Sequence, residues 1–173
     1  IVTNVATTAK LAEYLRTGMP LVEKMLTVDG GAIAEPKNII APIGTEIKDI
    51  IAFCGGYKKE AKKILMGGPM MGIVVVSDEF PLVKNNNAIL AFDEEESNKE
   101  FETACIRCGR CLRACPFDLA PAALDSAYRH GDVEALKALK VNLCMECGCC
   151  AYVCPAKRHL VVYNQLGKQM IKK

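Results

Sequence analysis

The sequence predicts an α+β fold in two parts, a small unit of strands with one helix followed by a mainly α-helical, cysteine-rich unit. Short apolar runs separated by glycine and proline occupy residues 21–92, which favours strands and tight turns. Nine of the ten cysteines lie between Cys105 and Cys154. An acidic stretch, residues 93–100, separates the two parts and is expected to be a solvated linker.

Composition and charge exclude several classes of protein. Of the 173 residues 51% are hydrophobic and 24% are charged, which is typical of a globular protein. The net charge of +2 is too small to predict nucleic-acid binding or a polybasic membrane anchor. No apolar run approaches the roughly 18 residues of a transmembrane segment. The start has neither a signal peptide nor a Met, so we expect a piece of a longer protein.

A helix is predicted over residues 1–20, where apolar side chains recur at helical spacing until Met19-Pro20 ends the pattern. The members of this apolar stripe are Leu11, Tyr14, Leu15 and Met19.

The unit over residues 21–92 is expected to hold five strands. Lys24–Gly31 gives a strand and a turn, and Asn38–Gly44 gives a second strand. Residues 62–76 give two strands around a glycine–proline turn, and Ala88–Phe92 adds one more.

One helix is predicted between these strands. Thr45 is expected to cap its N-terminus, and Gly55-Gly56 to end it. Its buried stripe consists of Ile47, Ile50 and Ile51.

Two short helices and a longer one are predicted in the cysteine-rich unit. Asp118 is expected to cap the first, with Pro121 in its opening turn. Gly131 ends that helix and Asp132 begins the second. The tail, residues 158–173, is predicted to form the third.

The cysteines form two groups with one spacing, C-x2-C-x2-C-x3-C-P. This is the bacterial run that binds [4Fe–4S] clusters, in which the fourth cysteine ligates the other cluster. We therefore assign cluster 1 to Cys105, Cys108, Cys111 and Cys154. Cluster 2 is assigned to Cys144, Cys147, Cys150 and Cys115.

Zinc and disulfides are the alternatives. Paired C-x2-C groups also bind zinc, but one zinc ion needs only four ligands rather than eight in two matched runs. A disulfide framework is typical of secreted chains, whereas tight repeated spacing without a secretion signal favours metal and a reducing compartment. Cys54 and Cys149 fall outside the pattern and are expected to be small buried hydrophobes.

Five cations lie within or beside the two groups, and two roles for them stay open. They could offset the negative charge of a thiolate-ligated cluster, or they could dock an acidic partner. These residues are Arg107, Arg110, Arg113, Lys157 and Arg158.

The strings CIRCGRCLRACPFDLAP, GDVEALKALKVNLCMECGCCAYVCPAK and LVVYNQLGK resemble the C subunit of the Rnf complex, a membrane-associated, ion-pumping oxidoreductase that links ferredoxin and NAD. The resemblance covers the whole chain. It implies that residues 21–92 form a soluble-ligand-binding β-grasp (SLBB) domain, followed by a bacterial-type 2[4Fe–4S] ferredoxin domain over residues 101–173. The NADH-binding subunit of respiratory complex I has a similar arrangement, with one cluster where this chain would carry two.

The resemblance also implies that this chain is the C-terminal part of the subunit, and that residues 1–20 are the last helix of an upstream flavin module. FMN and NADH are then expected only in that missing module. Its helix begins with an Asn-Asn-Val-Glu-Thr-like string that touches the flavin phosphate. Asn4 and Thr7 match this string, while Thr3 and Ala6 depart from it. A plain helix start is the alternative for Asn4 and Thr7.

The function expected from these residues is relay of single electrons through two [4Fe–4S] clusters. The resemblance implies other Rnf subunits as partners, including a ferredoxin-like iron–sulfur subunit, and a peripheral place on the cytoplasmic side of the cell membrane. The fragment alone is not expected to complete a reaction. The alternative is an assembly module in which the SLBB domain docks subunits and the clusters are mainly structural. Cobalamin-reductase relatives are a third possibility.

Overall fold

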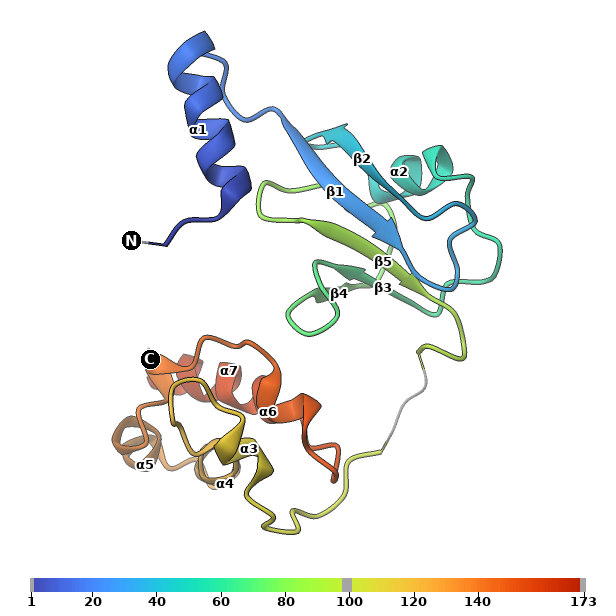
Figure 1. Ribbon diagram of the computed structural model, residues 1–173. Coiled ribbons are helices and arrows are strands. Elements are labelled where there is room, and N and C mark those ends of the chain that lie inside the picture. The colour runs from blue at the N-terminus through green and yellow to red at the C-terminus, as the bar shows by residue number, and fades with distance from the viewer. Residues whose placement is uncertain (1, 98–100, 172–173) are drawn as a thin grey trace. The chain divides into compact units, whose positions relative to one another are not determined.

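The computed structural model describes residues 2–97 and 101–171, and the chain divides into two compact units, residues 1–98 and 99–173 (Figure 1). The first unit contains a mixed sheet with one short helix beside it, and the second is helical (Figure 1). The predicted α+β class is therefore confirmed. No helix within the described ranges combines the length and the hydropathy needed to cross a membrane.

Five strands form the sheet of the first unit in the order β2-β1-β5-β3-β4. The central strands β1 and β5 run parallel, with Thr27 opposite Ala88, and every other neighbouring pair is antiparallel. The chain forms the antiparallel pair β1–β2, continues through one helix, and then adds β3, β4 and β5, with β5 parallel to β1. This is the β-grasp arrangement that the resemblance implied. The bounds are β1 Glu23–Asp29, β2 Lys37–Pro42, β3 Lys63–Met66, β4 Ile73–Val75 and β5 Ala88–Phe92.

The core of this unit lies between one face of the sheet and helix α2 (Ile47–Phe53). Because successive side chains of a strand point to opposite faces, β1 buries only Leu26 and Val28, and β5 buries Ile89 and Ala91. The helix contributes the predicted stripe, and all three of its members are buried: Ile47, Ile50 and Ile51.

The predicted cap of helix α2 was wrong. The Thr45 hydroxyl donates to the Pro42 carbonyl at 2.9 Å, and Glu46 takes the cap position without a side-chain bond. The first amides of the helix bind backbone instead, Ile47 N to the Phe80 carbonyl at 3.0 Å. A distant segment thus replaces the capping side chain. The end was predicted correctly, since Gly55 and Gly56 have φ of +80° and +79°.

Helix α1 (Val5–Thr17) confirms the helix predicted over residues 1–20, with two differences. The Asn4 side chain caps it by accepting from Ala6 N at 2.9 Å. Gly18, at φ +71°, ends the helix before Met19-Pro20 is reached. The helix has no buried residue, so its apolar stripe lies on the surface of this unit.

The acidic stretch after β5 is not wholly solvated, which corrects the prediction for residues 93–100. Asp93 is only 5% exposed, and its carboxylate accepts from the amides of Glu95 and Glu96. The Lys59 ammonium lies 2.7 Å from the same carboxylate and lowers the pKa of Asp93. Glu96 accepts from Gly31 N at 2.6 Å. Residues 98–100 lie outside the described ranges.

Helices of the second unit pack around a small apolar core. They are α3 Arg110–Arg113, α4 Pro121–Arg129, α5 Val133–Ala138, the 3-10 turn η1 Val141–Leu143, α6 Cys149–Tyr152 and α7 Leu160–Ile171. Leu124, Leu136 and Val141 are fully buried between them. The predicted tail helix is thus confirmed as α7.

Two predictions for the helix termini of this unit had different outcomes. Asp132 caps α5 as expected, since its carboxylate accepts from Ala135 N at 2.9 Å. Asp118 does not cap α4, because it adopts a left-handed conformation at φ +52°, and Ala120 takes the cap position without a side-chain bond. Pro121 occupies the opening turn as predicted, and Gly131 follows the helix at φ +69°.

Candidate metal centre

The two cysteine groups share one backbone conformation as well as one spacing. Each cysteine of the first group is matched by one 39 residues later. Positive φ angles recur with this offset at Arg107 and Glu146, and at Gly109 and Gly148. Helices α3 and α6 also correspond, because each begins directly after its glycine. Such left-handed positions curl a short loop, so that its cysteines point inward to a common centre.

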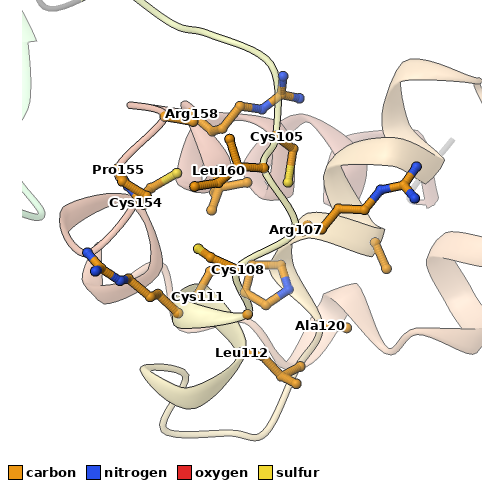
Figure 2. Close-up of a pocket in the computed structure, with 17 residues that line it drawn as sticks. Cys105, Arg107, Cys108, Cys111, Leu112, Ala120, Cys154, Pro155, Arg158 and Leu160 are labelled. Carbon is orange, nitrogen blue, oxygen red and sulfur yellow. The ribbon is translucent and has the colours of Figure 1, made fainter.

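One cavity joins the first three cysteines to the last one. Cys105, Cys108 and Cys111 line a cavity of about 270 Å³, and Cys154 lines the same cavity (Figure 2). Cys154 comes from the other cysteine group, after helix α6. The structure therefore brings together the four residues assigned to cluster 1.

A second, smaller cavity is lined by three cysteines of the second group and one of the first. Cys144, Cys147 and Cys150 line it together with Cys115, which follows helix α3. Its volume is about 20 Å³, much smaller than that of the first cavity. These are the four residues assigned to cluster 2.

Helix α4 begins at the wall of the first cavity. Burial raises the pKa of the Cys111 thiol, and a hydrogen bond from the Ala122 amide works in the opposite direction. Ala122 belongs to the first turn of α4, whose free amides and dipole favour negative charge nearby. The helix start is therefore suited to a ligating thiolate at Cys111.

The second cavity is better shielded. Cys150 is 7% exposed, and burial raises the pKa of its thiol to about 12. Cys105 and Cys108, in contrast, are exposed. A cation bound in this cavity would favour the thiolate form of Cys150.

Besides the Ala122 amide, further donors reach sulfurs of candidate ligands in the described part of this unit. The Leu119 amide donates to Cys115 Sγ at 3.4 Å, and the Asn164 side-chain amide donates to Cys144 Sγ at 3.5 Å. Donors to thiolate sulfur stabilise a negatively charged cluster and tune its potential. Neither residue was singled out from the sequence.

A partly buried ionic network lies against the wall of the first cavity. Arg158 lines the cavity, and its side chain is 13% exposed. Its guanidinium pairs with Asp125 and lies 3.1 Å from Glu102. Arg129 pairs with the same two carboxylates, both at 2.7 Å, and Tyr163 donates to Glu102 at 3.0 Å. The network fixes the segment after Cys154 to helices α4 and α7.

The donor set fits a cluster better than a single ion. Within residues 2–97 and 101–171, no three His, Cys, Asp or Glu side chains converge as closely as one metal ion requires. Zinc holds its thiolates at about 2.3 Å and so draws them against one another. A [4Fe–4S] cluster takes one thiolate on each iron and keeps its ligands farther apart. The thiols around the two cavities match that chemistry in number and type, and the first cavity, of about 270 Å³, is also larger than a single water molecule needs, whereas the second, of about 20 Å³, holds about one.

Of the five cations, Arg107, Arg110 and Arg158 line the first cavity, whereas the two remaining cysteines do not line either cavity. Cys54 is buried in the core of the first unit, as expected. The prediction that Cys149 is buried was wrong, because this residue is only half-buried. A hydrogen bond with Cys147 and, to a smaller extent, partial burial raise the pKa of the Cys149 thiol. Asn4 and Thr7 belong to the first unit, apart from all eight cysteines.

Comparison with known families divides the chain as the structure does. Residues 25–74 match the SLBB domain. Residues 102–159 match the 4Fe-4S dicluster domain, which contains both cysteine groups. The sheet of the first unit continues beyond the SLBB match, since β5 lies at Ala88–Phe92.

Curated relatives carry the two domains in longer chains. The chain is 46% identical over 124 residues to the C subunit of the proton-translocating ferredoxin:NAD(+) oxidoreductase complex of Clostridium ljungdahlii, covering 72% of this chain and 27% of that one. It is 41% identical over 143 residues to the C subunit of the ion-translocating oxidoreductase complex of Rhodobacter capsulatus, covering 83% and 27%. For the same subunit of Methanosarcina acetivorans the identity is 39% over 171 residues, covering 99% and 38%. The chain thus spans between about a quarter and two fifths of these relatives.

Proposed function

Because the chain is homologous to part of the C subunit of ion-translocating, Rnf-type oxidoreductase complexes and joins an SLBB domain to a 4Fe-4S dicluster domain, we propose that it relays single electrons through two [4Fe–4S] clusters. Each cluster would supply a one-electron carrier when bound. In the whole protein the relay would serve electron exchange between ferredoxin and NAD.

The crossed lining of the two cavities carries this proposal. Each cavity takes three cysteines from one group and the fourth from the other. This is the ligand pattern of two-cluster ferredoxins. Because each cysteine group would supply one ligand to the other cluster, the two clusters would lie close together in one domain. Electron transfer between them requires this short separation.

The protein residues around the cavities would position and shield the two centres. The loops with left-handed Arg107 and Glu146 would point their thiolates inward. The Asp125–Arg158 pair would hold the segment that carries Cys154. Exposure of Cys105 and Cys108 would leave one centre accessible to a redox partner, while Cys150 stays screened from water.

The similarity to subunits of a multi-subunit complex supports a proposal about partners and place in the cell. We propose contact with other subunits of the complex, including a ferredoxin-like iron–sulfur subunit, on the cytoplasmic side of the membrane. FMN and NADH would bind in the remainder of the longer protein. Asn4 and Thr7 would approach the FMN phosphate only there, and in this chain Asn4 serves as the cap of α1.

A second candidate function is the docking of another subunit by the first unit. Strand β4 is an edge strand, and the hairpin that contains it carries exposed apolar side chains. They are Met70, Met71, Ile73, Val74 and Val76. Exposed apolar edges invite pairing with another chain. If docking is the function, the clusters would chiefly stabilise the fold.

Iron and acid-labile sulfide content, with EPR spectra during a dithionite titration, separates these functions. All steps are anaerobic. The relay requires about eight iron and eight sulfide per chain and clusters that cycle reversibly between two oxidation states. Eight iron without reversible reduction would favour the docking function. Zinc, or no sulfide after anaerobic reconstitution, would rule out the relay.

A further inference from the structure

Asn164 is the buried polar side chain that reaches a ligand of the second centre. It lies in helix α7 and is 1% exposed. It lines the second cavity, and its side-chain amide donates to Cys144 Sγ at 3.5 Å. An amide buried beside an apolar cavity wall is costly unless it is hydrogen-bonded. The Asn164 amide nitrogen has Cys144 Sγ as its acceptor, whereas Oδ1 is buried with no hydrogen-bond partner among the described residues.

Neighbouring residues of α7 hold the same loop in place. Lys168 donates to the Cys144 carbonyl and lies 2.7 Å from the Glu146 carboxylate. Gln165 donates to Glu146 at 3.0 Å. Because Glu146 adopts φ +61°, these bonds stabilise a strained loop conformation. Helix α7 thus holds Cys144 and Glu146 of the loop in place, and Asn164 is the residue of this helix that donates to sulfur.

The repeat supplies an internal comparison. Asp125 stands 39 residues before Asn164 and is also buried, at 3% exposure. An ionised carboxylate cannot donate to a thiolate. Asp125 instead binds Arg129 and Arg158. The two halves of the repeat therefore differ at this position. Asn164 donates a hydrogen bond to the sulfur of Cys144, whereas Asp125 forms ion pairs with arginines.

We propose that Asn164 tunes the second centre by donating to the Cys144 thiolate, so that cluster 2 is easier to reduce than it would be without this donor. The inference rests on the proposed function, because it requires the clusters. Reduction adds one electron from dithionite, and no bond to the protein forms or breaks. The added negative charge spreads onto the sulfurs, so a donor stabilises the reduced state more than the oxidised state.

The test is an EPR-monitored redox titration of the reconstituted full chain carrying Asn164→Leu or Asn164→Asp. Leucine removes the donor without adding charge, and aspartate keeps the shape. Both variants are expected to retain about eight iron per chain. At a fixed applied potential, the reduced fraction of cluster 2 should be several-fold smaller than in the unsubstituted chain, and the reduced fraction of cluster 1 should be unchanged. Asn142→Asp, an exposed residue near Cys144, adds the same charge and should cause a much smaller change.

Three outcomes would overturn the inference, and they are distinguishable. Full iron content with unchanged potentials in Asn164→Leu would mean that the amide does not act on the cluster. Loss of iron from both variants, with unchanged potentials in the clusters that remain, would assign Asn164 a structural role only. Absence of iron and sulfide from the unsubstituted chain would remove the proposed function itself, and this inference with it.

Discussion

The carboxylate of Asp125 and the guanidinium of Arg158 form a buried ion pair between positions 33 residues apart. Their side chains are 4% and 13% exposed. The pair joins helix α4 to the segment directly after Cys154-Pro155. It therefore links the folding of the helical core to the position of a ligand that the second cysteine group contributes to the first cavity.

Asp125→Ala is expected to destabilise the second unit by about 3 kcal/mol, because it leaves a buried guanidinium without its main partner. Chemical denaturation of the reconstituted chain, followed by circular dichroism under anaerobic conditions, measures this loss. Asp132→Ala is a matched control that removes the cap of α5, and it should cost about 1 kcal/mol. A loss for Asp125→Ala no larger than that for Asp132→Ala would contradict the large contribution expected of the buried pair.

Paired cysteine substitutions test the crossed ligands. If Cys105 and Cys154 hold one cluster, Cys105→Ala/Cys154→Ala should keep the other and retain about four iron per chain. Cys144→Ala/Cys154→Ala should then damage both clusters and retain almost none. Iron and sulfide analysis after anaerobic reconstitution gives the answer. The reverse pattern would mean that each cysteine group binds its own cluster.

Local elements of this chain were predictable because their signals lie within a few residues. The alternation in β1 places Leu26 and Val28 in the core, and the stripe of α2 is buried as expected. The cysteine spacing assigned four ligands to each cluster, since it reflects a loop that wraps one centre, and this assignment stays a prediction. The structure places each of the two sets around one cavity.

Features that depend on distant segments were not predictable in the same way. Thr45 resembles a cap, yet the amides of α2 bind the carbonyls of Asp78 and Phe80, some 30 residues away. Asp93 resembles a solvated residue, but the Lys59 side chain and two amides hold it in place. Asn164 carries no local signal. Only its equivalence to Asp125 in the repeat, together with the structure, reveals its role.

Gly30→Ala should destabilise the first unit strongly. Gly30 has φ +117°, and an added Cβ would lie 2.2 Å from the Ala91 carbonyl oxygen in β5. Both the strained backbone and the steric overlap with a rigid strand oppose the substitution, so we expect a loss of about 3 kcal/mol. Thermal or urea unfolding of the full chain measures the transition of this unit.

Gly44→Ala is the matched control for that experiment. Gly44 has φ +98°, and a Cβ there would meet no heavy atom within 4 Å. Only the backbone cost remains, about 1–2 kcal/mol. Iron content should be unaffected in both variants, because all eight candidate ligands lie in the other unit. Similar losses for the two glycines would contradict the close approach of Gly30 to β5.

Lowering the pH should remove the contribution of Glu102 to the free energy of unfolding. Burial raises the pKa of this carboxyl, but the Tyr163 hydroxyl and the guanidinium groups of Arg158 and Arg129 outweigh it and hold the pKa below the ordinary 4.5. Since the folded pKa is the lower one, Glu102 stabilises the fold fully above pH 4.5, and this contribution is lost as the pH falls through the folded pKa. Glu102→Gln should therefore be less stable than the unsubstituted chain near neutral pH.

The difference in unfolding free energy between the two proteins should shrink steadily below about pH 4.5, and it should be constant from about pH 6 to 7. Comparing the two proteins at each pH cancels the acid sensitivity that the clusters themselves contribute. Glu134→Gln, on a side chain that is 83% exposed, makes the same charge change and should show little difference at any pH. A difference for Glu102→Gln that did not vary with pH would mean that the network does not depend on the ionised carboxylate.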